Sequence, residues 1–223
     1  MLDLYTWNTP NGRKATIMLE EIAQPYTLKP IDIGTGAQKE HDFLHINPNG
    51  RIPALYDHET GARVFESGAI LLYLAEKYPA GAALLPRTPV ERAEVLSWTY
   101  WQTGGLGPML GQYNHFSSLN ADSPKTQSSL PYAQKRFKNE SLRLLNVLNE
   151  HLQENTFIGG RHYSIADIMN FPWVSAALTS LAPQAEPTFK YLNALLRWHR
   201  VIEARPAVKN GLQRLTDLSQ SRY

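Results

Sequence analysis

The stretch from Ile46 to Leu74 places the tightest limits on how this chain folds. Pro53 stands at the entry to the apolar run Ala54-Leu-Tyr56. Proline cannot donate to a sheet ladder, so it is tolerated only at a strand start, an edge or a bulge. A cis X-Pro bond costs only about 0.5–1 kcal/mol, so a cis peptide is compatible with this tight entry. We therefore expect the backbone of Ile52 to be available for pairing with something other than protein.

A second predicted strand, Arg63 to Glu66, leads directly into a helix that begins at Ser67. The first amides of a helix are unpaired and carry partial positive charge, so a ligand carboxylate can bind there. Glu66 could hold a ligand ammonium beside it. Together with an extended edge, this arrangement suits a small zwitterionic peptide. The alternative is that Pro53 only shapes a turn and Ser67 only caps a helix, and this stretch alone does not decide between them.

The residues before this stretch alternate between strand and helix patterns. Leu2 to Trp7 alternates as a strand does, and Tyr26 to Ile33 is typical of a second strand. A helix between them shows one apolar stripe, formed by Ala15, Met18, Leu19, Ile22 and Ala23. A short helix is predicted over 39–47. The order β-α-β-α-β-β-α predicts a small four-stranded mixed sheet with helices packed on it.

Residues 79–90 contain several prolines and a glycine, which are typical of a linker, and no strand pattern follows them. We predict a first domain over 1–80, a linker over 81–89 and an all-helical domain over 90–223. The polar segment Ser117–Ser129 is predicted to be a mobile loop, and Ser164-Ile-Ala-Asp167 matches a capping box. The predicted helices of the second domain are 90–116, 131–155, 164–178, 188–204 and 206–218.

Composition excludes several classes of function. A net charge of +2, without basic clusters that interleave with aromatics, argues against nucleic-acid binding. No secretion signal or membrane span is found, so we expect a soluble, cytoplasmic protein. The chain has no cysteine, which excludes disulfides, zinc-thiolate sites and a protein thiol nucleophile. His41 and His45 could share a helix face, but no third ligand follows, and we predict no metal site.

Over nearly its full length the chain resembles the glutathione transferase family. Arg51-Ile-Pro53 followed by Phe65-Glu-Ser-Gly68 carries the resemblance in the N-terminal half, and the Ser164-to-Asp167 box carries it in the C-terminal half. The resemblance implies a thioredoxin-like first domain and an all-α second domain. The chain is most similar to the bacterial Nu-class proteins, which have disulfide reductase activity. Those matches are Thr9-Pro-Asn-Gly12, Asp32 to Gln38, the glycine-rich segment Trp101 to Gly111, and Pro131-Tyr-Ala with Arg136.

The resemblance also implies roles for single residues in binding glutathione. Ile52 resembles the residue whose backbone pairs with the cysteinyl unit, and Glu66 with Ser67 resembles the pair that holds the γ-glutamyl end. Gln38 resembles a side chain at the glycyl side, and Arg136 resembles a basic residue near the bound glutathiones. The expected ligand is two reduced glutathiones per site, or one oxidised glutathione.

Thr9 and Asn11 are the predicted activators of the sulfur. A free thiol has a pKa near 8.5 and reacts as the thiolate, so a site must favour the ionised form. The Thr9 hydroxyl and the Asn11 amide can both donate to sulfur, and the first helix begins beside them. The competing interpretation is that Thr9 caps this helix with Pro10 at its first position. Tyr5, four residues before Thr9, is expected to pack rather than to activate.

The resemblance and the missing cysteine together predict a glutathione-dependent disulfide reductase. Thiol-disulfide exchange needs an attacking and a leaving thiolate, and here both would come from small molecules. One alternative is conjugation of glutathione to an electrophile, or reduction of a peroxide. Another is a binding module without enzymatic activity. The resemblance further implies a homodimer, with the predicted helix at Ser67 packing against the long helices of 90–155.

Overall fold

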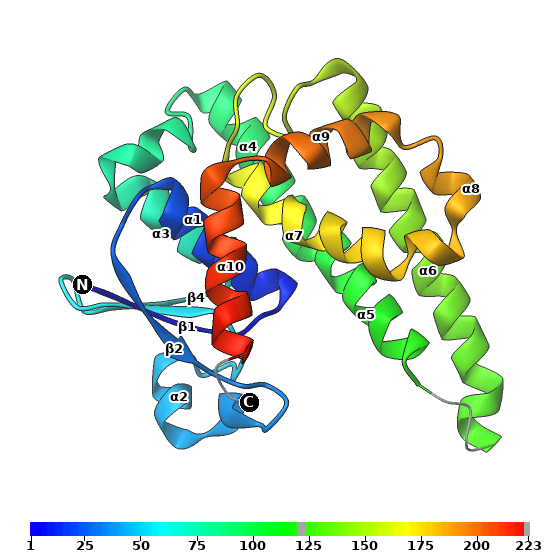
Figure 1. Ribbon diagram of the computed structural model, residues 1–223, viewed down its shortest axis with the longest axis horizontal. Helices are drawn as coiled ribbons and strands as arrows, with labels where there is room; N and C mark the ends of the chain where they lie inside the picture. The colour runs from blue at the N-terminus through cyan, green and yellow to red at the C-terminus, as the bar shows by residue number, and fades with distance from the viewer. Residues whose placement is uncertain (120–123, 221–223) are drawn as a thin grey trace. The chain divides into compact units, whose positions relative to one another are not determined.

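The computed structural model describes residues 1–119 and 124–220, which form two compact units (Figure 1). The first unit comprises residues 1–93 with the described part of 202–223, and the second comprises residues 94–201. The first unit contains a mixed α/β arrangement and the second is helical. Elements from Met1 to Lys77 are β1 (Leu2–Thr6), α1 (Pro10–Glu21), β2 (Tyr26–Pro30), α2 (His41–Ile46), β3 (Ala54–Asp57), β4 (Ala62–Phe65) and α3 (Ser67–Lys77).

The predicted order β-α-β-α-β-β-α is confirmed, and the four strands form one sheet in the order β2-β1-β3-β4. β1 pairs parallel with β2 and antiparallel with β3, while β3 pairs antiparallel with β4. The register places Tyr5 opposite Ala54, and Ala54 opposite Phe65. The end of β1, the start of β3 and the end of β4 therefore lie at one end of the sheet.

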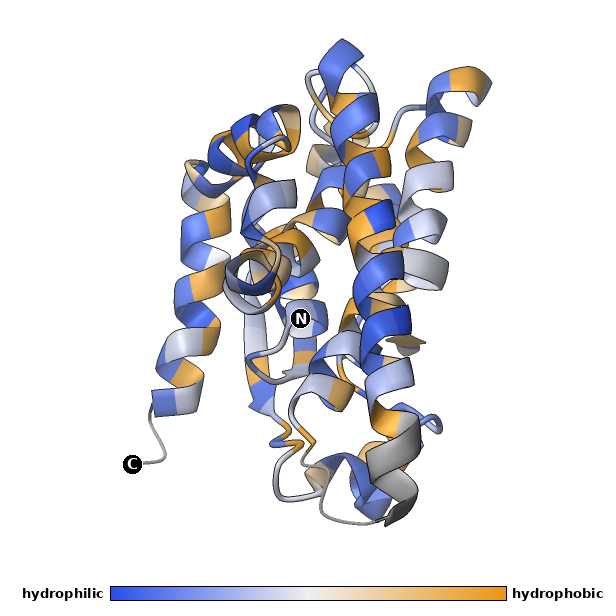
Figure 2. Cartoon of the chain, turned by 90° about the vertical axis from the view of Figure 1, so that its right-hand side faces the viewer, coloured by the Kyte–Doolittle hydropathy of each residue, from blue (hydrophilic) through white to orange (hydrophobic). Residues whose placement is uncertain are grey.

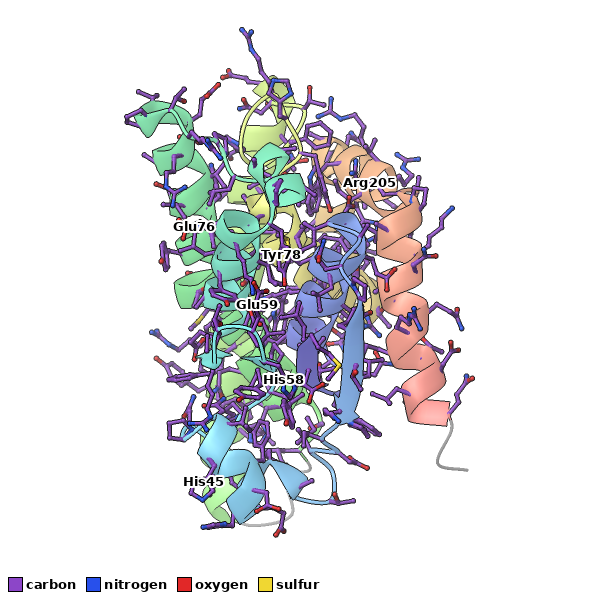
Figure 3. The ribbon with its side chains drawn as sticks, turned by 90° about the vertical axis from the view of Figure 1, so that its left-hand side faces the viewer. His45, His58, Glu59, Glu76, Tyr78 and Arg205 are labelled. Carbon is purple, nitrogen blue, oxygen red and sulfur yellow. The ribbon has the colours of Figure 1, made fainter. Side chains whose placement is uncertain are left out.

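Helix α10 (Pro206–Gln220) returns to pack against α1 (Figure 1). Gly211 permits the close approach, because a Cβ at this position would lie 2.8 Å from the Cα of Ile17. Arg205, labelled in Figure 3, lies just before α10 and makes two hydrogen bonds to Glu21 of α1, at 2.7 and 2.8 Å. Apolar and polar residues alternate in bands along α10, which runs to the C label in Figure 2, as an amphipathic surface helix requires.

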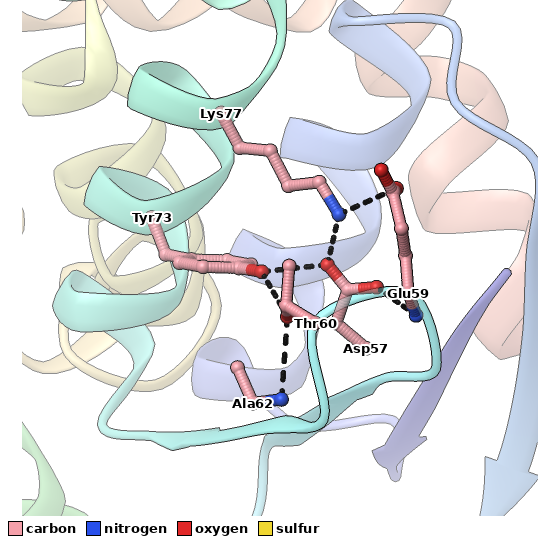
Figure 4. Close-up of polar contacts among 6 residues, drawn as sticks. All are labelled: Asp57, Glu59, Thr60, Ala62, Tyr73 and Lys77. Atoms are coloured by element: carbon pink, nitrogen blue, oxygen red, sulfur yellow. Dashed lines mark hydrogen bonds and ion pairs between the residues drawn. The ribbon is translucent and has the colours of Figure 1, made fainter.

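A buried polar cluster joins the β3–β4 hairpin to α3 (Figure 4). Asp57 is fully buried, and its carboxylate accepts from the Tyr73 hydroxyl at 2.6 Å and from the Lys77 ammonium. The backbone amide of Glu59 donates to the other carboxylate oxygen at 2.9 Å. Burial alone would raise the pKa of Asp57, but these donors outweigh it and lower that pKa to about 2.

The helical unit contains α5 (Gly107–Ser117), α6 (Pro124–Glu154), α7 (Ile165–Ser180) and α8 (Glu186–Phe189), with most of α4 (Pro89–Trp101) and α9 (Asn193–Glu203). The capping box predicted at Ser164 and Asp167 is confirmed at the start of α7. The glycine-rich segment forms a π-helical turn, Gln102–Leu106, before α5. Its glycines allow α5 to pack closely on α7, because a Cβ on Gly107 would lie 3.1 Å from Nε1 of Trp173.

The bounds of one predicted loop differ from the expectation. The predicted loop Ser117–Ser129 is too long, because α5 extends to Ser117 and α6 already begins at Pro124; residues 120–123 lie outside the described chain. The linker over 81–89 stays a prediction. The structure places a 3-10 turn, Pro79–Ala83, across its start, and groups α10 with the N-terminal unit rather than with the helical one.

Candidate active site

Thr9 stands at the turn between β1 and α1, where it caps the helix. Its side-chain oxygen accepts the Gly12 amide at 3.1 Å, and Pro10 occupies the first helical position. The capping interpretation is therefore confirmed, but it does not compete with a role in binding sulfur. A threonine hydroxyl that accepts one hydrogen bond still carries a hydrogen to donate.

Gly12 permits this turn to be tight. A Cβ at Gly12 would lie 2.1 Å from the backbone oxygen of Trp7 and 2.5 Å from Oγ1 of Thr6. Both distances are far below van der Waals contact, so no larger residue fits without moving β1 or the start of α1. The Gly12 amide also donates to Thr9, so the same residue positions the hydroxyl that faces the predicted sulfur site.

Asn11 meets a buried lysine one turn further along α1. The ammonium of Lys14 lies 2.9 Å from Oδ1 of Asn11 and 3.4 Å from Oγ of Ser67 on α3. Only 2% of Lys14 is exposed. Burial lowers the pKa of Lys14 to about 7, and the nearby carboxylate of Glu66 opposes that shift. Lys14 thus links the predicted sulfur side of the site to the predicted γ-glutamyl side.

Glu66 and Ser67 lie where β4 ends and α3 begins. Glu66 is the residue before the helix, with a φ of 70°, and no side chain caps α3 there. Ser67 is the first helical residue and is buried, so the interpretation that Ser67 merely caps the helix is wrong. A positive φ at a residue other than glycine costs about 1–3 kcal/mol and is concentrated at functional sites. The uncapped helix end keeps its amides available for a carboxylate.

Ile52 lies just before the first paired residue of β3, and the Ile52–Pro53 peptide is cis. Asn47 shapes the loop that leads to it. Its amide nitrogen donates to the backbone oxygen of Arg51 at 2.6 Å, and its oxygen accepts the Asn49 amide at 2.9 Å. Asn47 is only 1% exposed, so these bonds tie the loop immediately before Ile52 to a buried side chain.

Gln38 belongs to a short 3-10 turn, Ala37–Lys39. Its backbone oxygen lies close to Gly50, where a Cβ would meet it at 3.0 Å, so the turn adjoins the loop that leads to Ile52. The side-chain oxygen of Gln38 is buried and has no hydrogen-bond partner among the described residues. A buried polar atom without a partner is costly, and a ligand amide is one group that could satisfy it.

Tyr5 packs, as expected, within the first unit. Its ring lies 6.1 Å from that of Phe43, between centroids, in a tilted arrangement. Burial, Asp3 and Tyr56 all raise the pKa of Tyr5, which disfavours a phenolate. These observations give Tyr5 a packing role in the first unit.

Arg136 belongs to α6 of the helical unit, whereas the other predicted site residues belong to the first unit. Arg136 lines a surface concavity of about 700 Å³ within its own unit. Lys135 and Arg143 also line it; Arg143 is paired with Glu140 of the same concavity, so Lys135 and Arg136 are the cations that suit an anionic group. The remaining lining residues are Met109, Tyr132, Phe137, Asn139 and Glu140.

The structure brings most of the predicted residues to one end of the sheet. The register places the start of β3, and with it Ile52, beside the ends of β1 and β4, which lead to Thr9 and Glu66. Lys14 and Asn47 were missed from the sequence. The spacing of Lys14, three residues after Asn11 on a helix, indicates a contact between the two side chains but not the burial of Lys14, and Asn47 enters the sequence analysis only as the last residue of the helix predicted over 39–47.

Metal and membrane chemistry receive no support from the described residues. Within residues 1–119 and 124–220, no three His, Cys, Asp or Glu side chains are grouped to hold a metal ion. His41 and His45 contact each other at 3.1 Å on the exposed surface of α2. Over the same described ranges, no helix is both long and apolar enough to cross a membrane.

Comparison with protein families and curated proteins agrees with this geometry. Residues 1–76 match the family described as glutathione S-transferase, N-terminal domain, and residues 115–206 match the corresponding C-terminal domain. The disulfide-bond oxidoreductase YfcG of Escherichia coli K12 is 45% identical over 217 residues, which cover 95% of this chain and 94% of YfcG. The disulfide-bond oxidoreductase YghU of the same strain is 38% identical, over 94% of this chain and 73% of YghU.

Solved structures extend the likeness to the fold. A glutathione transferase family member from Pseudomonas fluorescens, with two glutathiones bound, superposes with a TM-score of 0.83 at 38% identity, over 95% of this chain and 92% of that one. A glutathione transferase from Pseudomonas putida, with one glutathione disulfide bound per subunit, superposes with a TM-score of 0.83 at 37% identity, over 95% of this chain and 90% of that one.

Proposed function

The chain belongs to the glutathione S-transferase family, and we propose that it is a Nu-class enzyme that uses glutathione to reduce small disulfides without a protein cysteine. The observation that carries the proposal is the gathering of Thr9, Asn11 and the uncapped start of α3 at one end of the sheet. No sulfur of the chain can take part, since cysteine is absent and a methionine thioether does not exchange with a disulfide.

We assign the γ-glutamyl end of glutathione to Glu66 and Ser67. Its carboxylate binds the Ser67 hydroxyl and the first amides of α3, while its ammonium pairs with the Glu66 carboxylate. The cysteinyl backbone pairs with Ile52 as an additional strand would, and the glycyl side adjoins Gln38. This orientation directs the cysteinyl sulfur toward the turn that holds Thr9 and Asn11.

The reaction proceeds by two exchanges between sulfurs. The thiolate of one glutathione attacks the substrate disulfide, forms a mixed disulfide and releases one substrate thiolate. The thiolate of a second glutathione then attacks the glutathione sulfur of that mixed disulfide and releases the other substrate thiolate. Two glutathiones become one glutathione disulfide, and their two protons end on the two substrate thiols. Donors from Thr9 and Asn11 favour the attacking thiolate near neutral pH.

Solved relatives that hold two glutathiones, or one glutathione disulfide, support this stoichiometry. Arg136, with the cationic concavity around it, is the proposed anchor for anionic groups of the bound glutathiones. We further propose that the protein acts in the cytoplasm as a homodimer. Light scattering of the purified chain tests the dimer, and a monomer at working concentration would overturn it.

The test is glutathione-dependent reduction of a small disulfide, coupled to NADPH oxidation through glutathione reductase. We expect activity in the wild type, retention in Thr9→Ser, and loss of at least tenfold in kcat/KM in Thr9→Val or Asn11→Ala, about the effect of one lost donor. Thr27→Ala, on the exposed surface of β2, is the matched control. If the wild type binds glutathione but turns over only a halogenated aromatic, conjugation replaces reduction as the proposed activity. If it binds glutathione and shows no thiol chemistry, the protein is a binding module.

A further inference from the structure

Lys14 is the most unusual charged residue of the first unit. It lies on the second turn of α1 and is almost completely buried. A buried ammonium is unfavourable unless several groups satisfy it, so its presence requires an explanation. Lys77 of the same unit, for comparison, makes a direct ion pair with Asp57 that joins two secondary-structure elements. The contacts of Lys14 include the neutral amide of Asn11 and the hydroxyl of Ser67.

The contact with Asn11 determines which end of the Asn11 amide can donate. An ammonium has three donors and no acceptor, so the Asn11 atom 2.9 Å from it must be the oxygen. This choice cannot be made for most asparagines, whose oxygen and nitrogen are interchangeable in shape. With its oxygen held by Lys14, the amide has only Nδ2 to offer to a ligand, and Nδ2 is a donor.

The contact with Ser67 serves the other end of the same ligand. The Lys14 ammonium can donate only, so at 3.4 Å it holds the Ser67 oxygen as an acceptor. The Ser67 hydroxyl hydrogen is then available to a carboxylate at the start of α3. The Glu66 carboxylate, the charged group that acts on Lys14, helps to keep the ammonium protonated.

We propose that Lys14 is a positioning residue that fixes Asn11 as a donor to the glutathione sulfur and Ser67 as a donor to the γ-glutamyl carboxylate. The proposal rests on the proposed function, because it assumes glutathione in this site. Lys14 acts through Asn11 and Ser67 rather than on the sulfur itself. The effects of removing Lys14 and Asn11 should therefore overlap instead of adding.

A double-mutant cycle tests the coupling. The variants are Lys14→Met, Asn11→Ala and the double variant, and the readout is the pKa of the glutathione thiol in the complex, followed by thiolate absorbance. We expect each single change to lower kcat/KM by about tenfold and to raise the thiol pKa. The double variant should match Asn11→Ala in thiol pKa, and its kcat/KM should fall further only by the part that Lys14 exerts through Ser67. Lys29→Met, the same chemical change at a half-exposed residue of β2, should leave both unchanged. Fully additive effects would overturn the proposal.

Asn11→Asp tests the orientation in a chain that keeps Lys14. The aspartate still accepts from the ammonium but has no Nδ2 to donate, so the folded protein should be at least as stable as the wild type. The thiol pKa of bound glutathione should nevertheless rise at least as far as in Asn11→Ala, because the new carboxylate also repels the thiolate. A normal thiol pKa in Asn11→Asp would contradict the assigned orientation.

Failure of the proposed reductase function and failure of the role of Lys14 give different results in these measurements. The thiol pKa is measured on bound glutathione and needs no turnover, so a wild type that binds glutathione without reducing disulfides refutes the reductase and still tests Lys14. A reductase whose thiol pKa is the same in Lys14→Met and the wild type refutes the role of Lys14 alone. A wild type that does not bind glutathione refutes both.

Discussion

The indole nitrogen of Trp198 on α9 donates to Oδ1 of Asp167 on α7 at 2.8 Å, and both residues are buried. The same carboxylate accepts the backbone amides of Ile158 and Ser164, each at 2.9 Å. A single side chain therefore joins α9, the start of α7 and the loop before it, all within the helical unit. The capping box predicted from sequence is one part of this larger cluster.

Asp167→Ala should strongly destabilise the protein. The change leaves three buried N–H donors without their acceptor, at about 1–3 kcal/mol each. We expect a loss of at least about 3 kcal/mol in the free energy of unfolding, measured by chemical denaturation. Trp198→Phe removes one donor and leaves Asp167 its other partners, so it should cost less. Equal losses in the two variants would contradict this ranking.

The Asp57 cluster should make the first unit sensitive to acid. The pKa of Asp57 is about 2 in the folded protein, below the 3.8 of a free aspartate, because hydrogen bonds outweigh its burial. The folded state therefore binds this proton less readily, and the stabilisation is present above pH 4 and is lost as the pH falls toward 2. Asp57→Asn should flatten the decline of unfolding free energy between these pH values. An unchanged acid profile would show that other carboxylates control it.

Much of the fold followed from local patterns, and the exceptions have physical causes. The four strands and α1 were predicted because alternation and the stripe from Ala15 to Ile22 are strong signals. The loop expected over Ser117–Ser129 was too long because polar residues and Pro124 were taken as loop signals, whereas Pro124 stands at the first position of α6, where proline is favoured.

Some residues of the candidate site are revealed by local sequence signals, and others only by tertiary contacts. Thr9, Ile52, Glu66 and Ser67 lie beside turns and helix starts, where residue type carries a backbone signal that a sequence can reveal. Lys14 carries no such signal, because its burial depends on α3 packing over the second turn of α1. A lysine on a helix is normally interpreted as exposed, and only the tertiary contact with Ser67 indicates otherwise.

Gly12→Ala should disrupt the sulfur side of the site. The new methyl group would lie 2.1 Å from the Trp7 backbone oxygen, so the start of α1 must shift. We expect a loss of about 1–3 kcal/mol, typical of overpacking, and a larger relative loss in kcat/KM because Thr9 moves with the turn. Gly104→Ala, where a Cβ would meet no atom within 4 Å, is the control for the same change remote from this turn. Wild-type activity in Gly12→Ala would mean that the turn tolerates the shift.

Glu66→Gln and Ser67→Ala should weaken glutathione binding in different ways. Each removes one charge-assisted hydrogen bond to the γ-glutamyl end, about 1.5–3 kcal/mol, or roughly ten- to a hundredfold in Kd. A glutathione analogue without the γ-glutamyl ammonium should bind wild type and Glu66→Gln equally, while Ser67→Ala should still weaken it. Calorimetric titration measures all these combinations. If both variants lose the same affinity for glutathione and for the analogue, the assignment of the ammonium to Glu66 and of the carboxylate to Ser67 is wrong.

Lys14 should couple glutathione binding to proton uptake. Burial lowers the pKa of Lys14 to about 7, against 10.5 for a free lysine, with Glu66 opposing the shift. Between these values the unfolded chain binds a proton that the folded protein does not, so stability rises with pH by up to about 1.4 kcal/mol per unit, and Lys14→Met should lack that rise. The bound γ-glutamyl carboxylate raises the pKa of Lys14 again, and binding above neutral pH then takes up a proton.

S-methylglutathione isolates this proton, because it has no thiol to ionise. Calorimetry in buffers of different ionisation enthalpy should show proton uptake by the wild type above neutral pH and none by Lys14→Met. Lys29→Met should behave as the wild type, since Lys29 is half exposed and lies on β2. Equal uptake by Lys14→Met and the wild type would assign the proton to another group. Uptake by neither would mean that Lys14 stays charged in the free protein.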